Sequence, residues 1–318
     1  MSIPEVVCVG RISVDLYAVE KNVGFDGPQS FTKSVGGSPT NVAVAAARLG
    51  RQAAIVTKVG GDGFGTFVRS KLADWGVCID HVGIDPQGQT PLALTALDPA
   101  DTPQVAFYRG NSAPDTTLLA ADLSFETVLN CGVLWISHGA LAQGTTAAAA
   151  MTWLEWRNRT GHTVLDLDYR PALWPDLETS RQMSRKAIGL STVVIGNLDE
   201  CEMALGTRDP EAAAAALLSA GVALAVIKRG GDGVYLATAG ERWNIAPIPI
   251  EVVSGLGAGD AFGGALSHGL LSGWSPDVIG HFANAAGAIV ASRLACAEAM
   301  PTLEELESMS IKKEKESC

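Results

Sequence analysis

The segment 254–262 combines a glycine-rich turn with a carboxylate, in the order Ser-Gly-Leu-Gly-Ala-Gly-Asp-Ala-Phe. Branched residues at 248–253 predict a strand before the turn, and residues 261–271 have helical spacing. The backbone N–H groups of Gly257–Gly259 would then point outward at the start of a helix, an arrangement that binds anions. A phosphoryl-transfer enzyme needs a base beside such a site to accept the proton of the attacking hydroxyl, and Asp260 could supply it. The same residues could also form a structural turn in which Asp260 caps the helix.

A second group of candidate residues lies near the N-terminus. Asp15 comes shortly after the predicted strand 6–9, close to the carboxyl end where α/β folds place ligand groups. Gly36 and Gly37 permit close approach of the backbone, and Asn41 lies at the start of the alanine-rich helix that follows them. If Asp15 and Asn41 face one cleft, they could hydrogen-bond a polyol from two sides. Asp15 could equally be a solvated strand residue, and Asn41 could simply cap its helix.

Three further sets of polar residues follow predicted strands. Each set lies at or just after the carboxyl end of its strand. Asp166, Asp168 and Arg170 belong to the strand 163–167, Asn197 and Glu200 to the strand 193–196, and Lys228, Gly230 and Gly233 to the strand 222–228. The amide and carboxylate of Asn197 and Glu200 could hold hydrated Mg²⁺, and the basic glycine turn at Lys228 suits nucleotide phosphates. Alternatively, Asn197 and Glu200 could simply cap a helix, and Lys228 could be an ordinary surface lysine.

Two arginines could bind a substrate carboxylate. Arg109 follows the predicted strand 105–108, and Arg170 follows the strand that ends near Asp166. A planar guanidinium matches a carboxylate with two parallel hydrogen bonds, which a neutral sugar would not use. The alternative is that Arg170 pairs with Asp166 or Asp168 and only braces its loop.

The order of the predicted elements favours an α/β fold. From residue 124 onward, strands and helices alternate, which predicts a mostly parallel sheet with helices on both faces. The helices are predicted at 144–160, 180–190, 199–206, 211–220, 260–272 and 277–293, and further strands at 133–136 and 233–238. The segments 12–35 and 90–110 lie outside this alternation and read as extended chain around turns. We expect them to form a small β-sheet lid that excludes water from a reacting phosphate, and the edges of such a lid favour pairing with a second subunit.

Composition excludes several classes of function. The net charge of −11 argues against nucleic acid as a partner, because phosphates require a basic face. Six cysteines without a Cys-x-x-Cys pair are typical of reduced core residues, and neither a signal peptide nor a membrane-spanning run is evident, so a cytoplasmic location without membrane contact is expected. No Gly-Lys dipeptide occurs, which excludes a Walker A loop.

The chain resembles the ribokinase-like (PfkB) family of sugar kinases over residues 5 to about 303, and two motifs carry this resemblance. They are Gly-Gly-Ser-Pro-Thr-Asn at 36–41 and Gly-Ala-Gly-Asp at 257–260. Within the family, Val-Asp-Leu-Tyr at 14–17 and Asp-Leu-Asp-Tyr-Arg-Pro at 166–171 are most similar to 5-dehydro-2-deoxygluconokinase of inositol catabolism. The related 2-dehydro-3-deoxygluconokinase and fructokinase stay open as alternatives, as does a non-catalytic binding protein.

The resemblance implies a ribokinase-like three-layer α/β/α sandwich, ATP and Mg²⁺ as cofactors, and transfer to the primary hydroxyl of a small sugar acid. It implies one kinase domain over 1–303, followed by a frayed, charged tail at 304–318, and a homodimer or higher oligomer formed through the lid. The implied roles are a general base at Asp260; an anion hole at Gly257, Ala258 and Gly259; sugar contacts at Asp15, Gly37 and Asn41; magnesium–phosphate contacts at Asn197 and Glu200; and nucleotide contacts at Lys228, Gly230, Gly233 and Asn284. Many members bind a monovalent cation beside the anion hole, and the absence of an acid at 254–256 weighs against that cation here.

Overall fold

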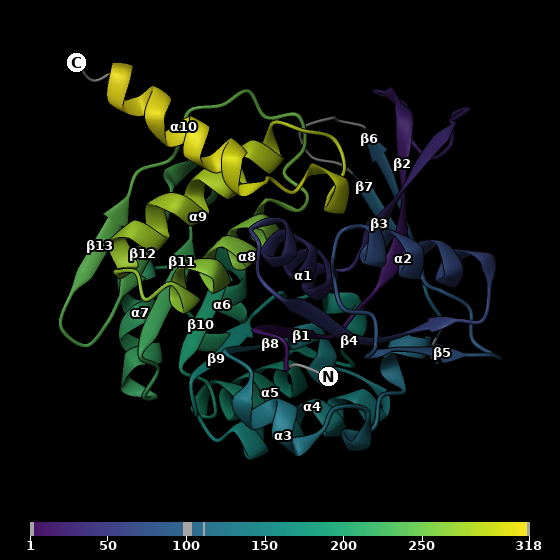
Figure 1. Cartoon of the computed structure of the whole chain (residues 1–318), viewed down its shortest axis with the longest axis horizontal. Helices are drawn as coiled ribbons and strands as arrows, with labels where there is room; N and C mark the ends of the chain where they lie inside the picture. Colours follow the sequence, from purple (N-terminus) through teal and green to yellow (C-terminus); the bar gives the residue numbers. More distant parts are fainter. Residues whose placement is uncertain (1–2, 98–103, 111, 317–318) are drawn as a thin grey trace.

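A nine-stranded, mostly parallel sheet forms the centre of the molecule. The computed structural model describes residues 3–97, 104–110 and 112–316 (Figure 1). Across the sheet, the strands are β13 (Arg242–Ile245), β12 (Val234–Ala237), β11 (Leu224–Lys228), β10 (Val193–Asn197), β9 (His162–Asp166), β8 (Val133–Ser137), β1 (Val6–Val9), β4 (Ala53–Gly60) and β5 (Val82–Asp85). The seven strands from β11 to β5 are parallel, so their carboxyl ends share one edge, while β12 and β13 run antiparallel.

Helices cover both faces of this sheet, as the alternation predicts. One face carries α1 (Ser38–Arg48), α2 (Gly63–Asp74), α8 (Ala258–Leu271), α9 (Pro276–Ala291) and α10 (Leu303–Glu316). The other carries α3 (Phe125–Asn130), α4 (Gly144–Arg157), α5 (Leu177–Gly189), α6 (Leu198–Leu205) and α7 (Pro210–Ser219). Alternate residues of β1 serve the two cores, since Val6 packs in one core and Val7 in the other. The predicted three-layer α/β/α sandwich is confirmed. None of the helices in the described ranges is long and apolar enough to cross a lipid bilayer.

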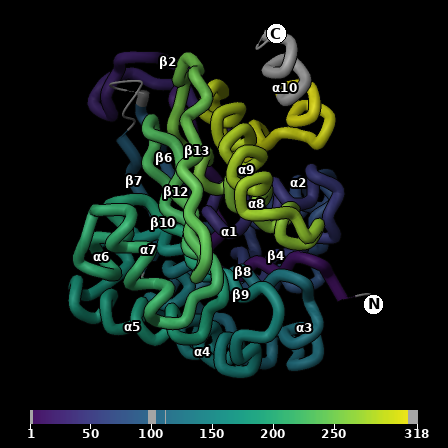
Figure 2. Tube along the Cα trace, turned by 90° about the vertical axis from the view of Figure 1, so that its left-hand side faces the viewer, coloured from purple at the N-terminus to yellow at the C-terminus, as the bar shows by residue number. Residues whose placement is uncertain are grey.

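The predicted lid is a separate four-stranded sheet. Its strands, in spatial order, are β3 (Phe31–Gly36), β2 (Ser13–Lys21), β6 (Leu92–Leu97) and β7 (Gln104–Tyr108). Figure 1 shows these four strands to one side of the main sheet, and Figure 2 shows β2, β6 and β7 on the upper part of the molecule. The chain passes from β1 into β2 and from β3 into α1, and it returns to the lid through β6 and β7 directly after β5, so the lid is attached to the main sheet at β1 and at the edge strand β5. The turn predicted at 99–103 lies outside the described residues.

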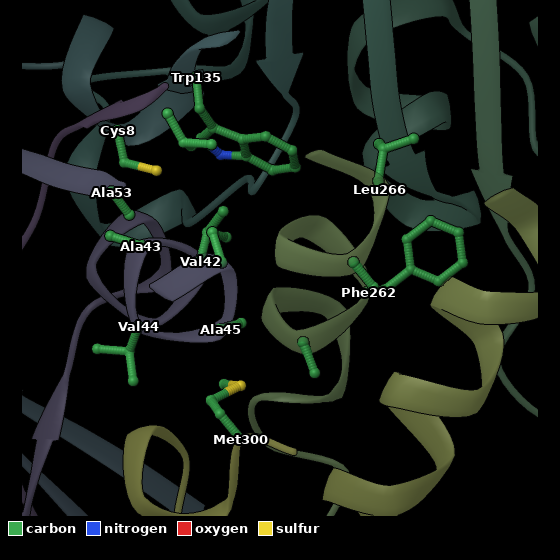
Figure 3. Close-up of a cluster of buried hydrophobic side chains, with 14 of the residues drawn as sticks. Cys8, Val42, Ala43, Val44, Ala45, Ala53, Trp135, Phe262, Leu266 and Met300 are labelled. Carbon is green, nitrogen blue, oxygen red and sulfur yellow. The ribbon is translucent and has the colours of Figure 1, made fainter. Parts of the chain in front are cut away.

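Helix α8, which begins in the glycine-rich turn, packs unusually close to α1. A Cβ at Gly264 would lie 2.3 Å from the Cβ of Ala45, and a Cβ at Gly263 would lie 2.7 Å from Cη2 of Trp135. Val42 of α1, the indole of Trp135, and Phe262 and Leu266 of α8 belong to one buried cluster, in which Phe262 and Leu266 lie on the side of α8 that faces away from α1 (Figure 3). The two glycines therefore fix the position of α8, and with it the position of the turn at its N-terminus.

Two expectations about secondary structure are wrong. The segment 248–253 is not a strand, because Pro247 and Pro249 lack the N–H groups that a sheet ladder requires. The frayed tail at 304–318 is instead mostly helical, since α10 extends to Glu316. The elements β5, β13 and α3 were not expected.

Candidate active site

A cavity of about 270 Å³ lies between the lid and the carboxyl edge of the main sheet. The lid closes it with Ala93, Thr95, Val105 and Phe107. Six of the predicted site residues also line the cavity, and they come from four separate stretches of the chain: Asp15, Gly37, Asn41, Arg170, Gly257 and Asp260. We refer to this space as the sugar cavity.

Asp260 lies in the first turn of α8 and faces two hydrogen-bond donors from α1. Ser38 Oγ donates to Oδ1 over 2.7 Å, and Asn41 Nδ2 donates to Oδ2 over 2.8 Å. Burial raises the pKa of Asp260 to about 6, and the nearby Asp168 carboxylate adds to the rise while the two donors oppose it. A carboxylate with this pKa is mostly ionised at pH 7 and can still accept a proton, as a general base must.

The backbone around Asp260 needs glycine. Gly257 is the N-cap of α8 with φ of 81°, in the left-handed region, and a Cβ there would lie 3.0 Å from Sγ of Cys296. Across the sugar cavity, Gly37 has φ of 99°, and a Cβ there would lie 2.4 Å from the carbonyl oxygen of Arg11. Both turns therefore depend on the absence of a side chain.

Asp15 points from β2 into the sugar cavity. Ser13 Oγ donates to Asp15 Oδ1 over 2.7 Å, and burial raises the pKa of Asp15 to about 6. Gly36 does not line the cavity, but it lies in β3 against the Asp15 carboxylate, which a Cβ at that position would overlap. Asn41 is not simply a helix cap, since its amide holds Asp260 rather than a backbone group.

A smaller cavity of about 160 Å³ adjoins the sugar cavity and is rich in arginine. Arg11, Arg109 and Arg170 all line it, and Arg11, Phe107 and Arg170 line both cavities. Arg109 Nη2 donates to Oδ1 of the fully buried Asp115 over 2.7 Å. Arg170 Nη2 lies 2.8 Å from Oδ1 of Asp168, which is the bracing contact that the sequence left as an alternative. We call this space the arginine cavity.

The two acids behind the arginine cavity respond differently to burial. The pKa of Asp115 is raised by burial, with Arg109 opposing the rise. Burial alone would raise the pKa of Asp168 as well, but the guanidinium groups of Arg11 and Arg170 outweigh it and lower that pKa. Asp168 is therefore an anion that orients two arginines at the junction of the cavities.

A third cavity, of about 330 Å³, lies on the other side of the α8 N-terminus. It is lined by the four residues predicted on the nucleotide side, Lys228, Gly230, Gly233 and Asn284, and by Ala258 and Gly259 of the predicted anion hole. Its opposite wall is apolar and comes from the segment 247–252, which was expected as a strand, and from α9. A cavity with phosphate-binding groups at one end and an apolar wall at the other suits a nucleotide.

Lys228 ends β11 beside the glycine turn. A Cβ at Gly259 would lie 3.2 Å from Lys228 Nζ, so the ammonium faces the N-terminal turn of α8. Burial alone would lower the pKa of Lys228, but the carboxylates of Glu200 and Asp166 outweigh it and raise that pKa. Asp166 itself is buried at the end of β9, and burial raises its pKa to about 8.

Asn197 and Glu200 line none of the three cavities. Instead, they form a reciprocal cap at the start of α6: Glu200 N donates to Asn197 Oδ1 over 2.9 Å, and Asn197 N donates to Glu200 Oε2 over 2.7 Å. Within the described residues, no group of three or more His, Cys, Asp or Glu side chains is arranged to hold a metal ion.

Several residues of the site were missed in the sequence. Arg11 lies directly after β1, where the same positional signal identified Asp15, and Ser38 lies inside the Gly-Gly-Ser-Pro motif. Tyr17 and Cys296 also line the sugar cavity, where the Tyr17 hydroxyl lies 2.8 Å from Cys296 Sγ. No local signal identifies Cys296, because its contact spans most of the chain.

Comparisons with known proteins agree with this geometry. A family profile described as pfkB family carbohydrate kinase matches residues 4–303. The chain is 33% identical over 310 residues to a 5-dehydro-2-deoxygluconokinase of Shouchella clausii, covering 96% of this chain and 95% of that protein. It is 33% identical over 308 residues to a 5-dehydro-2-deoxygluconokinase of Geobacillus thermodenitrificans, covering 95% of this chain and 91% of that protein.

Solved structures of similar fold include two kinases with bound nucleotide. A fructokinase of Xylella fastidiosa with bound ATP superimposes with a TM-score of 0.86 at 25% identity, covering 97% of this chain and 98% of that chain. A putative ribokinase II of E. coli in complex with ATP and Mg²⁺ superimposes with a TM-score of 0.88 at 25% identity, covering 97% of this chain and 99% of that chain.

Proposed function

The chain belongs to the pfkB family of carbohydrate kinases and is an ATP-dependent sugar kinase, and from this we propose that its substrate is a small sugar acid. The observation that carries the proposal is the arginine cavity, in which three guanidinium groups adjoin the space available for the sugar. Among sugar acids, we propose 5-dehydro-2-deoxy-D-gluconate of inositol catabolism as the substrate, because two relatives at 33% identity are named 5-dehydro-2-deoxygluconokinase.

In the proposed reaction, the γ-phosphoryl group passes from ATP to the primary hydroxyl of the sugar acid. Asp15 and Asn41 bind sugar hydroxyls, and the carboxylate lies toward Arg109 and Arg170. Asp260 accepts the proton of the attacking hydroxyl while the bond to the leaving ADP oxygen breaks. The N–H groups of Gly257–Gly259 and the ammonium of Lys228 stabilise the charge on the phosphoryl group during transfer.

The nucleotide occupies the third cavity in this proposal. Lys228, Gly230 and Gly233 lie toward its phosphates, and Asn284, which donates to the carbonyl oxygen of Ala246, supports the opposite wall. Magnesium is a general requirement of such kinases and would supply charge neutralisation on the phosphates. Asn197 and Glu200, which cap α6 outside the cavity, would contact magnesium only through its water ligands, and a monovalent cation beside the anion hole is not part of the proposal.

We further propose that the lid pairs with a second copy of the chain. Its side chains Val19, Phe31 and Tyr108 are apolar or aromatic and exposed. Exposed strand edges with such side chains favour association. Sedimentation velocity at micromolar concentration tests this, and a monomer throughout that range would contradict it.

A substrate panel tests the proposed function. ADP release is measured by a coupled assay with 5-dehydro-2-deoxygluconate, 2-dehydro-3-deoxygluconate, fructose and ribose, all with saturating ATP and Mg²⁺. The proposal expects the highest kcat/KM with one of the two acids. A preference for fructose or ribose would reject the acid, and binding without ADP release would show a non-catalytic protein. The variant Asp260→Asn is the control for phosphoryl transfer at this site.

A further inference from the structure

Arg11 lies where the sugar cavity and the arginine cavity meet. Its side chain is buried, with 8% of the residue exposed, and it lines both cavities. Nη2 donates to Oδ2 of Asp168 over 2.6 Å. Nε is also buried, and it has no hydrogen-bond partner within the described part of the chain. A buried guanidinium with donors left over is a costly arrangement unless a ligand completes it.

The direct ion pairs at this junction involve more arginines than acids. Three guanidinium groups come from three different places in the fold: Arg11 from the end of β1, Arg109 from the end of β7 and Arg170 from the loop after β9. They face two carboxylates, since Asp115 pairs with Arg109, and Asp168 is shared by Arg11 and Arg170. Among the described lining residues of the arginine cavity, none is acidic. The arginine cavity therefore presents guanidinium groups and no carboxylate, which suits an acidic group of a ligand, whereas Asp15 and Asp260 lie on the side of the sugar cavity.

Of the three arginines, Arg11 is the best placed to bind the carboxylate of a sugar acid. Arg170 is more exposed, with 44% of its side chain accessible against 9% for Arg11, so water screens it more strongly. Arg109 is engaged by Asp115, whose other oxygen accepts a hydrogen bond from Ile12 N over 3.2 Å. Arg11 is both buried and adjacent to the sugar.

We propose that Arg11 is a specificity-determining residue, whose guanidinium contacts the substrate carboxylate and rejects neutral sugars. Asp168 acts as a positioning residue by holding Nη2. Gly139, in the 3₁₀ turn His138–Leu141, is a second positioning residue, because a Cβ there would lie 2.9 Å from Arg11 Nε. The proposal rests on the proposed function, since it assumes a sugar acid as substrate.

The rejection of neutral sugars follows from the burial of Arg11. A substrate without a carboxylate leaves the guanidinium desolvated and incompletely hydrogen-bonded, which is the situation in which a polar site discriminates most strongly. A hydroxymethyl group in place of the carboxylate fills similar space but supplies no charge. Specificity would therefore come from the free energy of leaving Arg11 unmatched as well as from the contact with the acid.

The test compares kcat/KM for the preferred sugar acid with kcat/KM for its analogue that carries a hydroxymethyl group in place of the carboxylate. We expect Arg11→Met to lower kcat/KM for the acid about 10- to 100-fold, the range for loss of a charge-assisted hydrogen bond. For the neutral analogue, kcat/KM should rise, because no buried guanidinium is then left unmatched. Gly139→Ala should move the ratio in the same direction by displacing Arg11 without removing charge. The KM for ATP should stay constant in both variants.

The matched control is Arg208→Met. Arg208 is an exposed arginine that pairs with Asp199 and Glu202, and it lines none of the three cavities. An equal loss for acid and neutral analogue in Arg11→Met would show a merely structural role and overturn the inference. An unchanged ratio in a folded Gly139→Ala would do the same if Arg11→Met cannot be purified. If the wild-type enzyme accepts no sugar acid, the proposed function fails as well, whereas a wild type that prefers acids beside insensitive variants refutes only the role of Arg11.

Discussion

Removal of the hydroxyl of Ser38 should shift the pH dependence of the reaction without removing the catalytic base. Ser38 Oγ donates to Asp260 Oδ1 over 2.7 Å, and this hydrogen bond lowers the pKa of a carboxyl that burial has raised to about 6. The base works only when it is deprotonated, so activity falls as the pH drops through its pKa. Ser38→Ala removes a stabilising donor from the ionised form, which raises the pKa and moves the acid limb to higher pH.

The size of the shift follows from the strength of the contact. A hydrogen bond to a charged group contributes about 1.5–3 kcal/mol, and one pKa unit corresponds to about 1.4 kcal/mol. Water in the open cavity replaces part of the lost bond, and Asn41 keeps its own contact with Oδ2. We therefore expect a rise of about one unit, to roughly 7. At pH 6 the deprotonated fraction then falls from about one half to about one tenth, a roughly five-fold loss, while at pH 8.5 the two enzymes should be nearly equal.

The assay is the pH profile of kcat and of kcat/KM between pH 5 and 9, at saturating ATP. Ser13→Ala is the matched control, because Ser13 donates in the same way to Asp15, whose pKa is also about 6. A base acts in the bound complex, so Ser38→Ala should shift the profile of kcat, whereas Ser13→Ala should act mainly on KM. A uniform loss at every pH in Ser38→Ala, or an unmoved acid limb, would refute the assignment of Asp260 as the base.

Three other changes test other parts of the molecule. Asp260→Asn should lower kcat by about 10²- to 10⁴-fold with ATP affinity preserved in calorimetric titration, and turnover within a few-fold of the wild type would contradict it. Arg109→Met leaves the buried Asp115 without its cation and should lower the free energy of unfolding in urea by about 3–5 kcal/mol; replacing both residues by apolar ones should recover most of this loss. Gly264→Ala should cost about 1–3 kcal/mol, because its Cβ would overlap Ala45 in α1, whereas Gly189→Ala, with no atom within 4 Å, should not destabilise.

Much of the fold was predictable because its signals are local. Hydrophobic runs ending in glycine or polar residues mark the parallel strands, and the motifs at 36–41 and 257–260 mark the two turns that meet at the site. The segment 248–253 shows the limit of such signals. Its branched residues favour a strand, but the prolines at 247 and 249 prevent pairing, and this segment lines the third cavity instead.

Side-chain partners across the fold were harder to predict. Asn41 lines the same cavity as Asp15, as expected, but the sequence did not indicate that its amide also donates to Asp260, 219 residues away. Arg11 belongs to a stretch that drew attention through Asp15, yet its role depends on Asp168, 157 residues away. Neither contact leaves a trace in spacing or composition: the first depends on how the N-terminal turns of α1 and α8 pack together, and the second on β1 and β9 lying on either side of β8.

The N-terminus of α8 separates the sugar cavity from the third cavity, where we propose that the nucleotide binds, by a single turn of backbone. Gly257 and Asp260 line the first cavity, while Ala258 and Gly259 line the second. An inhibitor that joins a nucleoside to a sugar acid through a phosphate chain could therefore occupy both cavities across this turn. Such a compound loses translational and rotational freedom once instead of twice, so its affinity should exceed that of either half alone. Its carboxylate, placed toward the arginine cavity, would direct it to this kinase in preference to relatives that phosphorylate neutral sugars.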